Sequence, residues 1–169
     1  LYGDVAQRSD AYGVMIGEAQ QLAPGAGGVT LVPSFVPSTG PTRKFGTRGT
    51  VLGLELDTRR GHLYRAALEG LSFQMRHALE TLAEATGFQP ASVRVVGGGS
   101  KNALWNQIRA DVTGLPVITT EQQEATALGA AMFAFVGGGI FASPAEAQAA
   151  MDVGERTVEP GPDSPAYQD

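Results

Sequence analysis

Cysteine is absent from the chain of 169 residues. A disulfide framework and any metal site built on thiolates are therefore excluded. The absence suits a cytoplasmic protein, and that is the location we expect. The chain also has no apolar run close to the roughly 20 residues that a membrane span requires, so we expect no membrane partner.

Basic charge and histidine are scarce as well. Twelve Lys and Arg residues against seventeen Asp and Glu residues give a formal net charge of −5 and a pI near 5.0. A protein that binds nucleic acid broadly needs a basic face, so we expect no nucleic-acid partner. The two histidines, His62 and His77, stand fifteen positions apart with no matching carboxylate pattern, so the sequence predicts no metal ligands.

The two ends of the chain differ from its middle. Residues 1–4 lack an initiator methionine, a basic segment and an apolar segment, so they do not form a signal peptide. We expect them to be an internal stretch of a longer protein. Prolines and acidic residues dominate the last segment, and we predict a folded domain at 1–153 followed by a flexible tail at 154–169.

Hydrophobic periodicity predicts alternating strands and helices across the domain. Spacings of three and four mark the helices, and short runs rich in β-branched residues mark the strands. This alternation indicates an α/β layer structure with parallel pairing among the strands from residue 50 onward. The predicted helices are 9–22, 62–86, 102–113, 125–136 and 144–151, and the predicted strands are 29–32, 50–54, 93–96 and 117–119.

The longest predicted helix has a regular apolar stripe, which we expect to be its buried face. Glu69 stands beside this stripe, and we expect it to be a structural residue held by hydrogen bonds. Gly70 lies in the helix interior, where glycine costs about 1 kcal/mol relative to alanine, and a close backbone contact would explain its presence. The residues of the stripe are Leu71, Met75, Ala78, Leu82 and Ala85, and Tyr64, Leu68 and Leu79 widen it.

A glycine loop carries the sharpest chemical signal. The strand that ends at Val96 continues into the glycines 97–99 and Ser100, and a helix follows from Asn102. Glycines let a ligand approach the backbone with no Cβ in the way, and the helix offers N–H groups and the positive end of its dipole. The pattern fits a site for an anion or a nucleotide. It equally fits a tight turn in which Ser100 or Asn102 caps the helix.

Two well-known glycine motifs do not match this loop. A dinucleotide-binding loop would have a third glycine at position 102, where the chain has Asn102. A P-loop would have Gly-Lys-Ser/Thr, whereas Ser100 here precedes Lys101. A dinucleotide oxidoreductase domain and a P-loop domain are therefore both disfavoured.

Three segments resemble motifs of the FGGY carbohydrate kinases. Residues 97–108, Gly-Gly-Gly-Ser-Lys-Asn-Ala-Leu-Trp-Asn-Gln-Ile, resemble the C-terminal nucleotide motif of that family. Residues 61–71 resemble its long-helix motif, and residues 124–131 resemble its final signature. The three occur in the family's order, and the resemblance covers most of residues 29–153.

The resemblance implies the C-terminal lobe of an actin-like ATPase fold of the ribonuclease H type, with a mixed or parallel sheet flanked by helices. Such kinases use ATP and Mg²⁺ and hold ATP and a sugar between two lobes, of which the N-terminal one would lie upstream of this chain. Carried over to this sequence, Gly98, Gly99 and Asn102 would touch adenosine or the α-phosphate, and Ser100 would support them.

For other parts of the family pattern we assign either no role or a structural role. The aspartates Asp4, Asp10 and Asp57 have no recognisable catalytic setting, so we assign no catalytic residue. In the final signature, Ala127 and Gly129 are expected to allow close helix packing beneath the glycine loop.

A finer likeness concerns the sugar. Within the family, residues 58–62 and 105–108 look most like those of L-fuculokinases, which implies phosphorylation of L-fuculose to L-fuculose 1-phosphate. Xylulokinases and rhamnulokinases share much of the pattern and stay as alternatives, as does a nucleotide-binding or interaction module without catalysis. We expect the chain by itself to be inactive, because phosphoryl transfer requires positioning and electrostatic stabilisation from both sides and one lobe supplies only one side. The sequence is compatible with a homo-oligomer.

Overall fold

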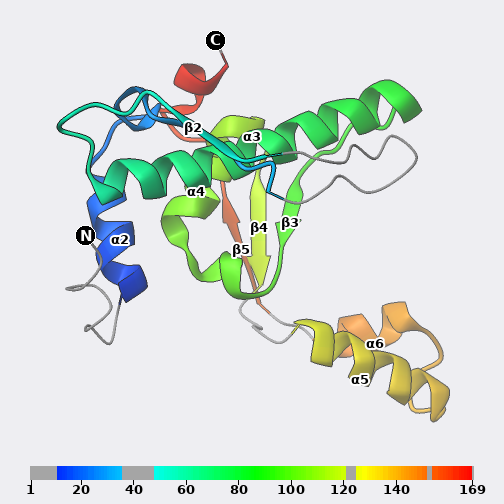
Figure 1. The fold of residues 1–169 in the computed structure, drawn as a ribbon. Helices are drawn as coiled ribbons and strands as arrows, with labels where there is room; N and C mark the ends of the chain where they lie inside the picture. Colours follow the sequence, from blue (N-terminus) through cyan, green and yellow to red (C-terminus); the bar gives the residue numbers. More distant parts are fainter. Residues whose placement is uncertain (1–10, 36–47, 121–124, 152–153, 169) are drawn as a thin grey trace.

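The structure is a computed structural model, and it describes residues 11–35, 48–120, 125–151 and 154–168. Its elements follow the predicted alternation of helices and strands closely (Figure 1). The helices are α2 (Ala11–Gln20), α3 (Arg60–Thr86), α4 (Ala103–Thr113), α5 (Ala125–Gly137) and α6 (Pro144–Ala150), with short 3₁₀ turns η1 (Ala26–Gly28), η2 (Gly98–Lys101) and η3 (Ser164–Tyr167). The strands are β1 (Thr30–Val32), β2 (Thr50–Leu52), β3 (Val93–Val95), β4 (Val117–Thr120) and β5 (Glu155–Val158).

The larger sheet has the order β3-β4-β5 and is mixed. The parallel pairing predicted for the strands at 93–96 and 117–119 is confirmed, since β3 and β4 run parallel with Val93 opposite Val117. On the other side of β4, the strand β5 runs antiparallel, with Val158 opposite Val117. Helix α4 connects β3 to β4, which is the connection that a parallel pair requires.

The flexible tail predicted at 154–169 is wrong for the described residues 154–168. This segment supplies strand β5 and ends in η3, where Tyr167 is only 6% exposed. The segment is held because the Asp111 side chain accepts a hydrogen bond from the backbone N–H of Gly161 at 2.6 Å. The Asp111 backbone carbonyl accepts a second bond, from the hydroxyl of Ser164, at 2.9 Å. Proline and acidic composition alone gave no sign of these partners.

The strands β1 and β2 form a separate antiparallel ladder, with Thr30 opposite Leu52. The expectation that the strand at 50–54 begins one parallel layer is therefore wrong for this strand. Strand β2 pairs with the strand before it in the chain, and α3 packs on β1. The contact with β1 explains Gly70, because an added Cβ there would overlap the carbonyl oxygen of Leu31.

Helix α3 buries its N-terminal half, and of the predicted stripe only Leu68 is fully buried. In the predicted stripe, Leu71 and Leu82 are 39% and 44% exposed. The helix is covered near its start by α2, β1 and α4, and its C-terminal end extends past these partners (Figure 1). The neighbours therefore decide which side is buried, and polar residues can lie there because they pair with one another. The buried residues of α3 are Gly61, Arg65, Ala66, Leu68, Glu69, Gly70 and Ser72.

The core lies between α3 and α4. Leu68 of α3 packs with Ile108 and Val112 of α4 and with Tyr167, while Trp105 adjoins this cluster. Burial of each aliphatic side chain of this size stabilises the fold by about 2 kcal/mol. The core therefore fixes the start of α4, and with it the glycine loop that precedes α4.

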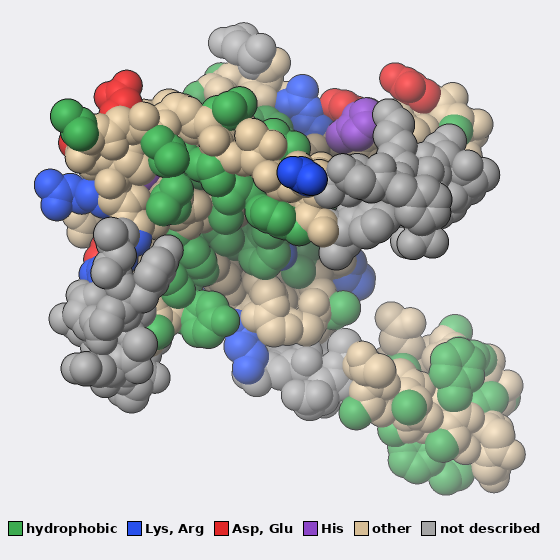
Figure 2. Space-filling model, viewed as in Figure 1, with side chains coloured by type: hydrophobic (Ala, Val, Ile, Leu, Met, Phe, Trp, Pro, Cys, Tyr) green, Lys and Arg blue, Asp and Glu red, His purple; other side chains and the backbone are tan. Residues whose placement is uncertain are grey.

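Helices α5 and α6 pack on each other and lie apart from the sheet (Figure 1). Ser143 caps α6 by accepting a hydrogen bond from the Glu146 N–H at 3.2 Å, as Ser-Pro at a helix start predicts. The close packing expected at Gly129 beneath the glycine loop is not seen, since an added Cβ there would meet nothing within 4 Å. The space-filling view shows hydrophobic side chains on the surface of this helix pair (Figure 2).

No helix in the described part of the chain is long and apolar enough to cross a membrane.

Candidate functional site

The glycine loop leaves β3 and turns through η2 into α4. Gly97 has a φ of 82° and a ψ of −169°, a conformation that favours glycine. The next residues form the single 3₁₀ turn η2, and the Ser100 hydroxyl donates to the Gly97 carbonyl at 2.7 Å. The loop is thus a fixed turn between a strand end and a helix start.

Asn102 closes this turn and begins α4. Its side-chain oxygen Oδ1 accepts a hydrogen bond from the backbone N–H of Trp105 at 3.1 Å, so Asn102 is the N-cap of the helix. Its Nδ2 donates to the hydroxyl of Tyr64 on α3 at 3.2 Å. Burial is the largest cause that raises the pKa of Tyr64, which keeps its phenol protonated. Asn102 therefore ties the loop to the long helix.

A stacked pair of side chains supports the loop from α4. The guanidinium carbon of Arg109 lies 3.6 Å from the centroid of the Trp105 ring, in cation–π contact. Arg109 Nη1 donates to the Gly99 carbonyl at 3.4 Å and to Asn106 Oδ1 at 2.8 Å. The indole Nε1 of Trp105 donates to the hydroxyl of Ser72 on α3 at 3.2 Å. Gly99 thus rests on a stack that both helices hold.

A cavity of about 600 Å³ opens beside the loop, and we call it the apolar cavity. It lies between the loop and the two helices α2 and α3. Aromatic and aliphatic side chains form most of its wall, with glycine backbone and Asn102 on one side. Its lining residues are Tyr12, Ile16, Tyr64, Ala67, Leu68, Leu71, Gly98, Gly99, Lys101, Asn102 and Trp105.

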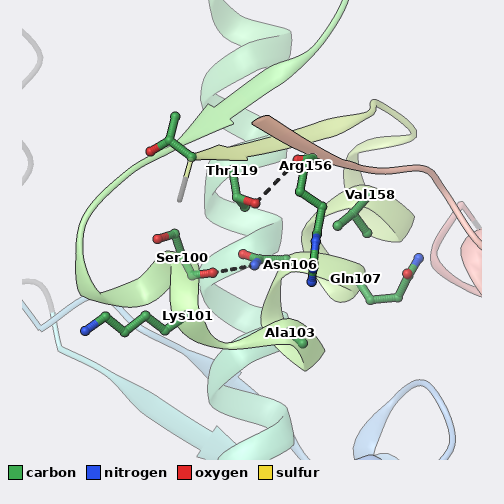
Figure 3. Close-up of a pocket in the computed structure, with 9 residues that line it drawn as sticks. Ser100, Lys101, Ala103, Asn106, Gln107, Thr119, Arg156 and Val158 are labelled. Carbon is green, nitrogen blue, oxygen red and sulfur yellow. Dashed lines mark hydrogen bonds between the residues drawn. The ribbon is translucent and has the colours of Figure 1, made fainter. Parts of the chain in front are cut away.

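A second cavity of about 490 Å³, which we call the polar cavity, lies between η2, α4 and the strands β4 and β5 (Figure 3). In this cavity Asn106 Nδ2 donates to the Ser100 carbonyl at 2.7 Å. The hydroxyl of Thr119 donates to the Arg156 carbonyl at 3.4 Å. Its lining residues are Ser100, Lys101, Ala103, Asn106, Gln107, Thr119, Thr120, Arg156 and Val158.

The four residues that the sequence predicts to bind the nucleotide lie on two sides of the glycine loop. Gly98, Gly99 and Asn102 come together on the wall of the apolar cavity. Ser100 lines the polar cavity instead, and its hydroxyl is engaged with the carbonyl of Gly97. Three of the four residues therefore line the same cavity. Ser100 does not line the apolar cavity and contributes to it only by fixing the conformation of the loop.

Sequence reasoning missed the pair formed by Trp105 and Arg109. These residues stand four positions apart on a helix, a spacing that places two side chains on the same face. That spacing was available in the sequence and could have pointed to the stack. The contact of Asn102 with Tyr64, which comes from a different helix, had no local signal.

Other candidate residues have structural roles or lie outside the described residues. His62 Nδ1 accepts a hydrogen bond from the backbone N–H of Arg59 at 3.0 Å at the start of α3. Asp4 and Asp10 lie outside the described residues. In the described part of the chain, no three His, Cys, Asp or Glu side chains gather where they could hold a metal ion.

The C-terminal domain of the FGGY family of carbohydrate kinases matches residues 4–138 of the chain. The chain belongs to this family. The match covers the glycine loop, both helices beside the apolar cavity and the Ala- and Gly-rich helix α5, so the site lies in the part of the chain that the family shares.

Curated FGGY relatives and solved FGGY structures agree with this match. The L-fuculokinase of Escherichia coli (strain K12) is 40% identical over 136 residues, which are 80% of this chain and 27% of that protein. The glycerol kinase of Delftia acidovorans is 40% identical over 149 residues, which are 84% of this chain and 30% of that protein. The chain is thus similar to kinases that act on different polyols and sugars.

The structure of xylulose kinase from Rhodospirillum rubrum aligns with a TM-score of 0.75 at 28% identity, over 96% of this chain and 33% of that one. The structure of Plasmodium falciparum glycerol kinase with ADP aligns with a TM-score of 0.72 at 25% identity, over 88% of this chain and 29% of that one. The expected fold, an α/β lobe of FGGY kinases with a mixed sheet flanked by helices, is confirmed. The chain spans about a third or less of the relatives that it matches.

Proposed function

We propose that this chain is the nucleotide-binding lobe of an ATP-dependent carbohydrate kinase and that the apolar cavity binds adenosine. One observation carries the proposal. Gly98, Gly99 and Asn102, which the family motif predicts to be binding residues, line one cavity whose remaining wall is aromatic and aliphatic except for Lys101. The match of the FGGY C-terminal domain to residues 4–138 supports the same assignment.

The chemistry of the apolar cavity suits a purine nucleoside better than a sugar or a bare anion. Small-molecule sites are concave and mostly apolar, with a few polar groups that fix orientation. The flat face of adenine can lie against the bare backbone of Gly98, where an added Cβ would meet nothing within 4 Å. At Gly99 the missing Cβ leaves room for the ring of Trp105 and for Arg109. The ring of Trp105 and the helix α3 supply apolar contact on other sides. The polar cavity offers no comparable apolar surface.

The proposed reaction is transfer of the γ-phosphoryl group of ATP to a sugar hydroxyl. Phosphoryl transfer depends on positioning and on electrostatic stabilisation around the phosphates. In this proposal the chain supplies one side, by binding and orienting the nucleotide, and the region upstream supplies the sugar site and the catalytic base. Mg²⁺ neutralises phosphate charge in such reactions. The described residues offer no cluster of carboxylates for it, so we assign no Mg²⁺ ligand to this chain.

The proposed sugar is L-fuculose, converted to L-fuculose 1-phosphate in the cytoplasm. The L-fuculokinases of Escherichia coli (strain K12) and Salmonella typhi, at 40% and 48% identity, support this choice. A ketose such as xylulose, or glycerol, is the alternative that the other relatives support. A coupled ATP-consumption assay of the full-length protein over L-fuculose, L-rhamnulose, D-xylulose and glycerol separates these substrates. If none of them is consumed, the non-catalytic nucleotide-binding module is the better proposal.

The fluorescence of one tryptophan can report nucleotide binding directly. Trp105 is its single tryptophan, and it lines the apolar cavity. Titration with ADP should therefore change the tryptophan fluorescence with saturation, and adenosine should do the same. The same titration with NAD tests whether the cavity is instead a dinucleotide site.

Two variants of α3 test whether ADP binds in the apolar cavity. Ala67 lines the apolar cavity, so Ala67→Leu should fill part of it and weaken ADP binding. Ala78→Leu adds the same atoms to an exposed position of the same helix and should leave ADP binding unchanged. If neither ADP nor adenosine alters the fluorescence of the unchanged chain, the adenosine site is not in this cavity.

A further inference from the structure

Arg109 is a buried cation without an acidic partner. It is only 7% exposed, and it forms no ion pair with any carboxylate in the described part of the chain. Arg65, the other buried arginine among the described residues, differs because it pairs with Glu69 at 2.8 Å. A buried charge without an opposite charge is unfavourable. The partners of Arg109 are all neutral: the ring of Trp105 and the oxygens of Gly99 and Asn106.

The position of Arg109 relates this unpaired charge to the glycine loop. Its Nη1 donates to the carbonyl of Gly99, and an added Cβ at Gly99 would lie 3.3 Å from its Nη2. The ring of Trp105 covers one face of the guanidinium and fixes its orientation. The positive charge therefore stands directly beside the backbone on which the proposed nucleotide would rest.

We propose that Arg109 is a positioning residue for the phosphate of the bound nucleotide, an inference that rests on the proposed function. Arg109 holds the carbonyl oxygen of Gly99 toward α4, which is away from the apolar cavity. An anion in the apolar cavity therefore does not meet the negative end of that carbonyl. Its fixed positive charge also favours an anion there, because a charge near a low-dielectric wall acts more strongly than one in water. Arg109 thereby helps the site to distinguish a phosphorylated nucleotide from the nucleoside.

The protonation of Arg109 is compatible with this role. Burial lowers its pKa to about 10, so the guanidinium stays charged at neutral pH. Unusual pKa values of this kind occur often at functional sites and also in structural networks. The pKa therefore does not decide between these two roles, and the functional role rests on the position of the guanidinium beside the Gly99 carbonyl.

The test compares the binding of adenosine with that of ADP to the 169-residue chain, and both are followed by the fluorescence of Trp105. Arg109→Gln removes the charge, and Arg109→Lys keeps it. Arg94→Gln is the matched control, because it removes a positive charge from an exposed position on β3, where Arg94 pairs with Glu155. Adenosine binding also serves as the control for folding of each variant.

The expected result for Arg109→Gln is a loss of ADP affinity of roughly tenfold, while adenosine affinity changes less than about twofold. Arg109→Lys should recover most of the ADP affinity, and Arg94→Gln should bind both ligands as the unchanged chain does. Equal loss of adenosine and ADP in Arg109→Gln would show a merely structural role and overturn the inference, as would unchanged ADP binding. A failure of the unchanged chain to bind either ligand would instead reject the proposed adenosine site itself.

Discussion

The hydroxyl of Tyr167 donates a hydrogen bond of 2.7 Å to the carboxylate of Glu69, a residue 98 positions earlier in the chain. The same carboxylate accepts from Arg65 at 2.8 Å and from the backbone N–H of Gly25 at 3.2 Å. Glu69 is 4% exposed and Tyr167 is 6% exposed. This buried cluster joins the C-terminal segment to α3 and to the turn before β1, and α3 in turn forms a wall of the apolar cavity.

Tyr167→Phe should lower the free energy of unfolding by about 1–3 kcal/mol. The change removes two hydrogen bonds, the one that the hydroxyl donates to Glu69 and the one that it accepts from Arg65 Nη2 at 2.9 Å. It leaves the buried Glu69 carboxylate with fewer donors, at almost unchanged shape. Urea denaturation followed by the fluorescence of Trp105 measures the effect. The control is Tyr12→Phe, at a position that is 72% exposed, where we expect a change below about 0.5 kcal/mol. Equal effects of the two changes would contradict a stabilising role for the cluster.

Stability should depend on the ionisation of Tyr167 at high pH. Burial and the contact with Glu69 raise the pKa of this phenol above its ordinary value of 10.0. The folded chain therefore keeps a proton that the unfolded chain releases above about pH 10, so the contribution of Tyr167 is fully present below that pH and falls as the pH rises further. Urea denaturation between pH 8 and 11 should show a steeper loss of stability above pH 10 for the unchanged chain than for Tyr167→Phe. Parallel curves would show that Tyr167 does not titrate differently in the two states.

Local sequence patterns predicted the order of strand, glycine loop and helix better than they predicted the packing around these elements. The strand, the glycine loop and the helix occupy consecutive residues, and the structure has β3, η2 and α4 in that order. The glycines and Asn102 are set by this local geometry, which explains why three of the nominated residues share a cavity. The contact of Tyr64 with Asn102 joins α3 to the start of α4. No short sequence pattern encodes a contact between two helices.

The buried face of α3 could not be predicted from its periodicity. Apolar spacing identified a helix correctly, but it did not reveal which neighbours would cover which side. Arg65 and Glu69 lie inside because they neutralise each other and because Tyr167 reaches them from the far end of the chain. Strand β5 was missed for the same reason, since its pairing with β4 joins residues that are distant in sequence.

Gly70→Ala should destabilise the chain by more than about 2 kcal/mol, because its Cβ would overlap the carbonyl of Leu31 in β1 and force α3 and β1 apart. The matched control is Gly17→Ala in α2, where an added Cβ meets nothing within 4 Å. Alanine favours a helix over glycine by about 1 kcal/mol, so Gly17→Ala should stabilise the chain slightly. Thermal unfolding measured by circular dichroism distinguishes the two. An increase in stability for both variants would show that α3 does not approach β1 at Gly70.

Gly98 and Gly99 offer a paired test of the loop, because the structure places them in different surroundings. An added Cβ at Gly98 meets nothing within 4 Å, and its φ is compatible with alanine. An added Cβ at Gly99 would lie 3.1 Å from the Trp105 ring and 3.3 Å from Arg109. Gly98→Ala should therefore keep the fold, with a free energy of unfolding that is unchanged or about 0.5–1 kcal/mol higher, whereas Gly99→Ala should displace the stack and lose about 1–3 kcal/mol.

The same pair should differ in how nucleotide binding is lost. At Gly98 the new methyl group occupies space on the wall of the apolar cavity, so ADP and adenosine should both bind about tenfold more weakly, which corresponds to about 1.4 kcal/mol. At Gly99 the displaced Arg109 should weaken ADP more than adenosine, and the fluorescence of Trp105 should change even without ligand. Fluorescence titrations of both variants, together with urea denaturation, measure these effects. If Gly98→Ala binds adenosine as tightly as the unchanged chain does, the purine does not lie against this glycine.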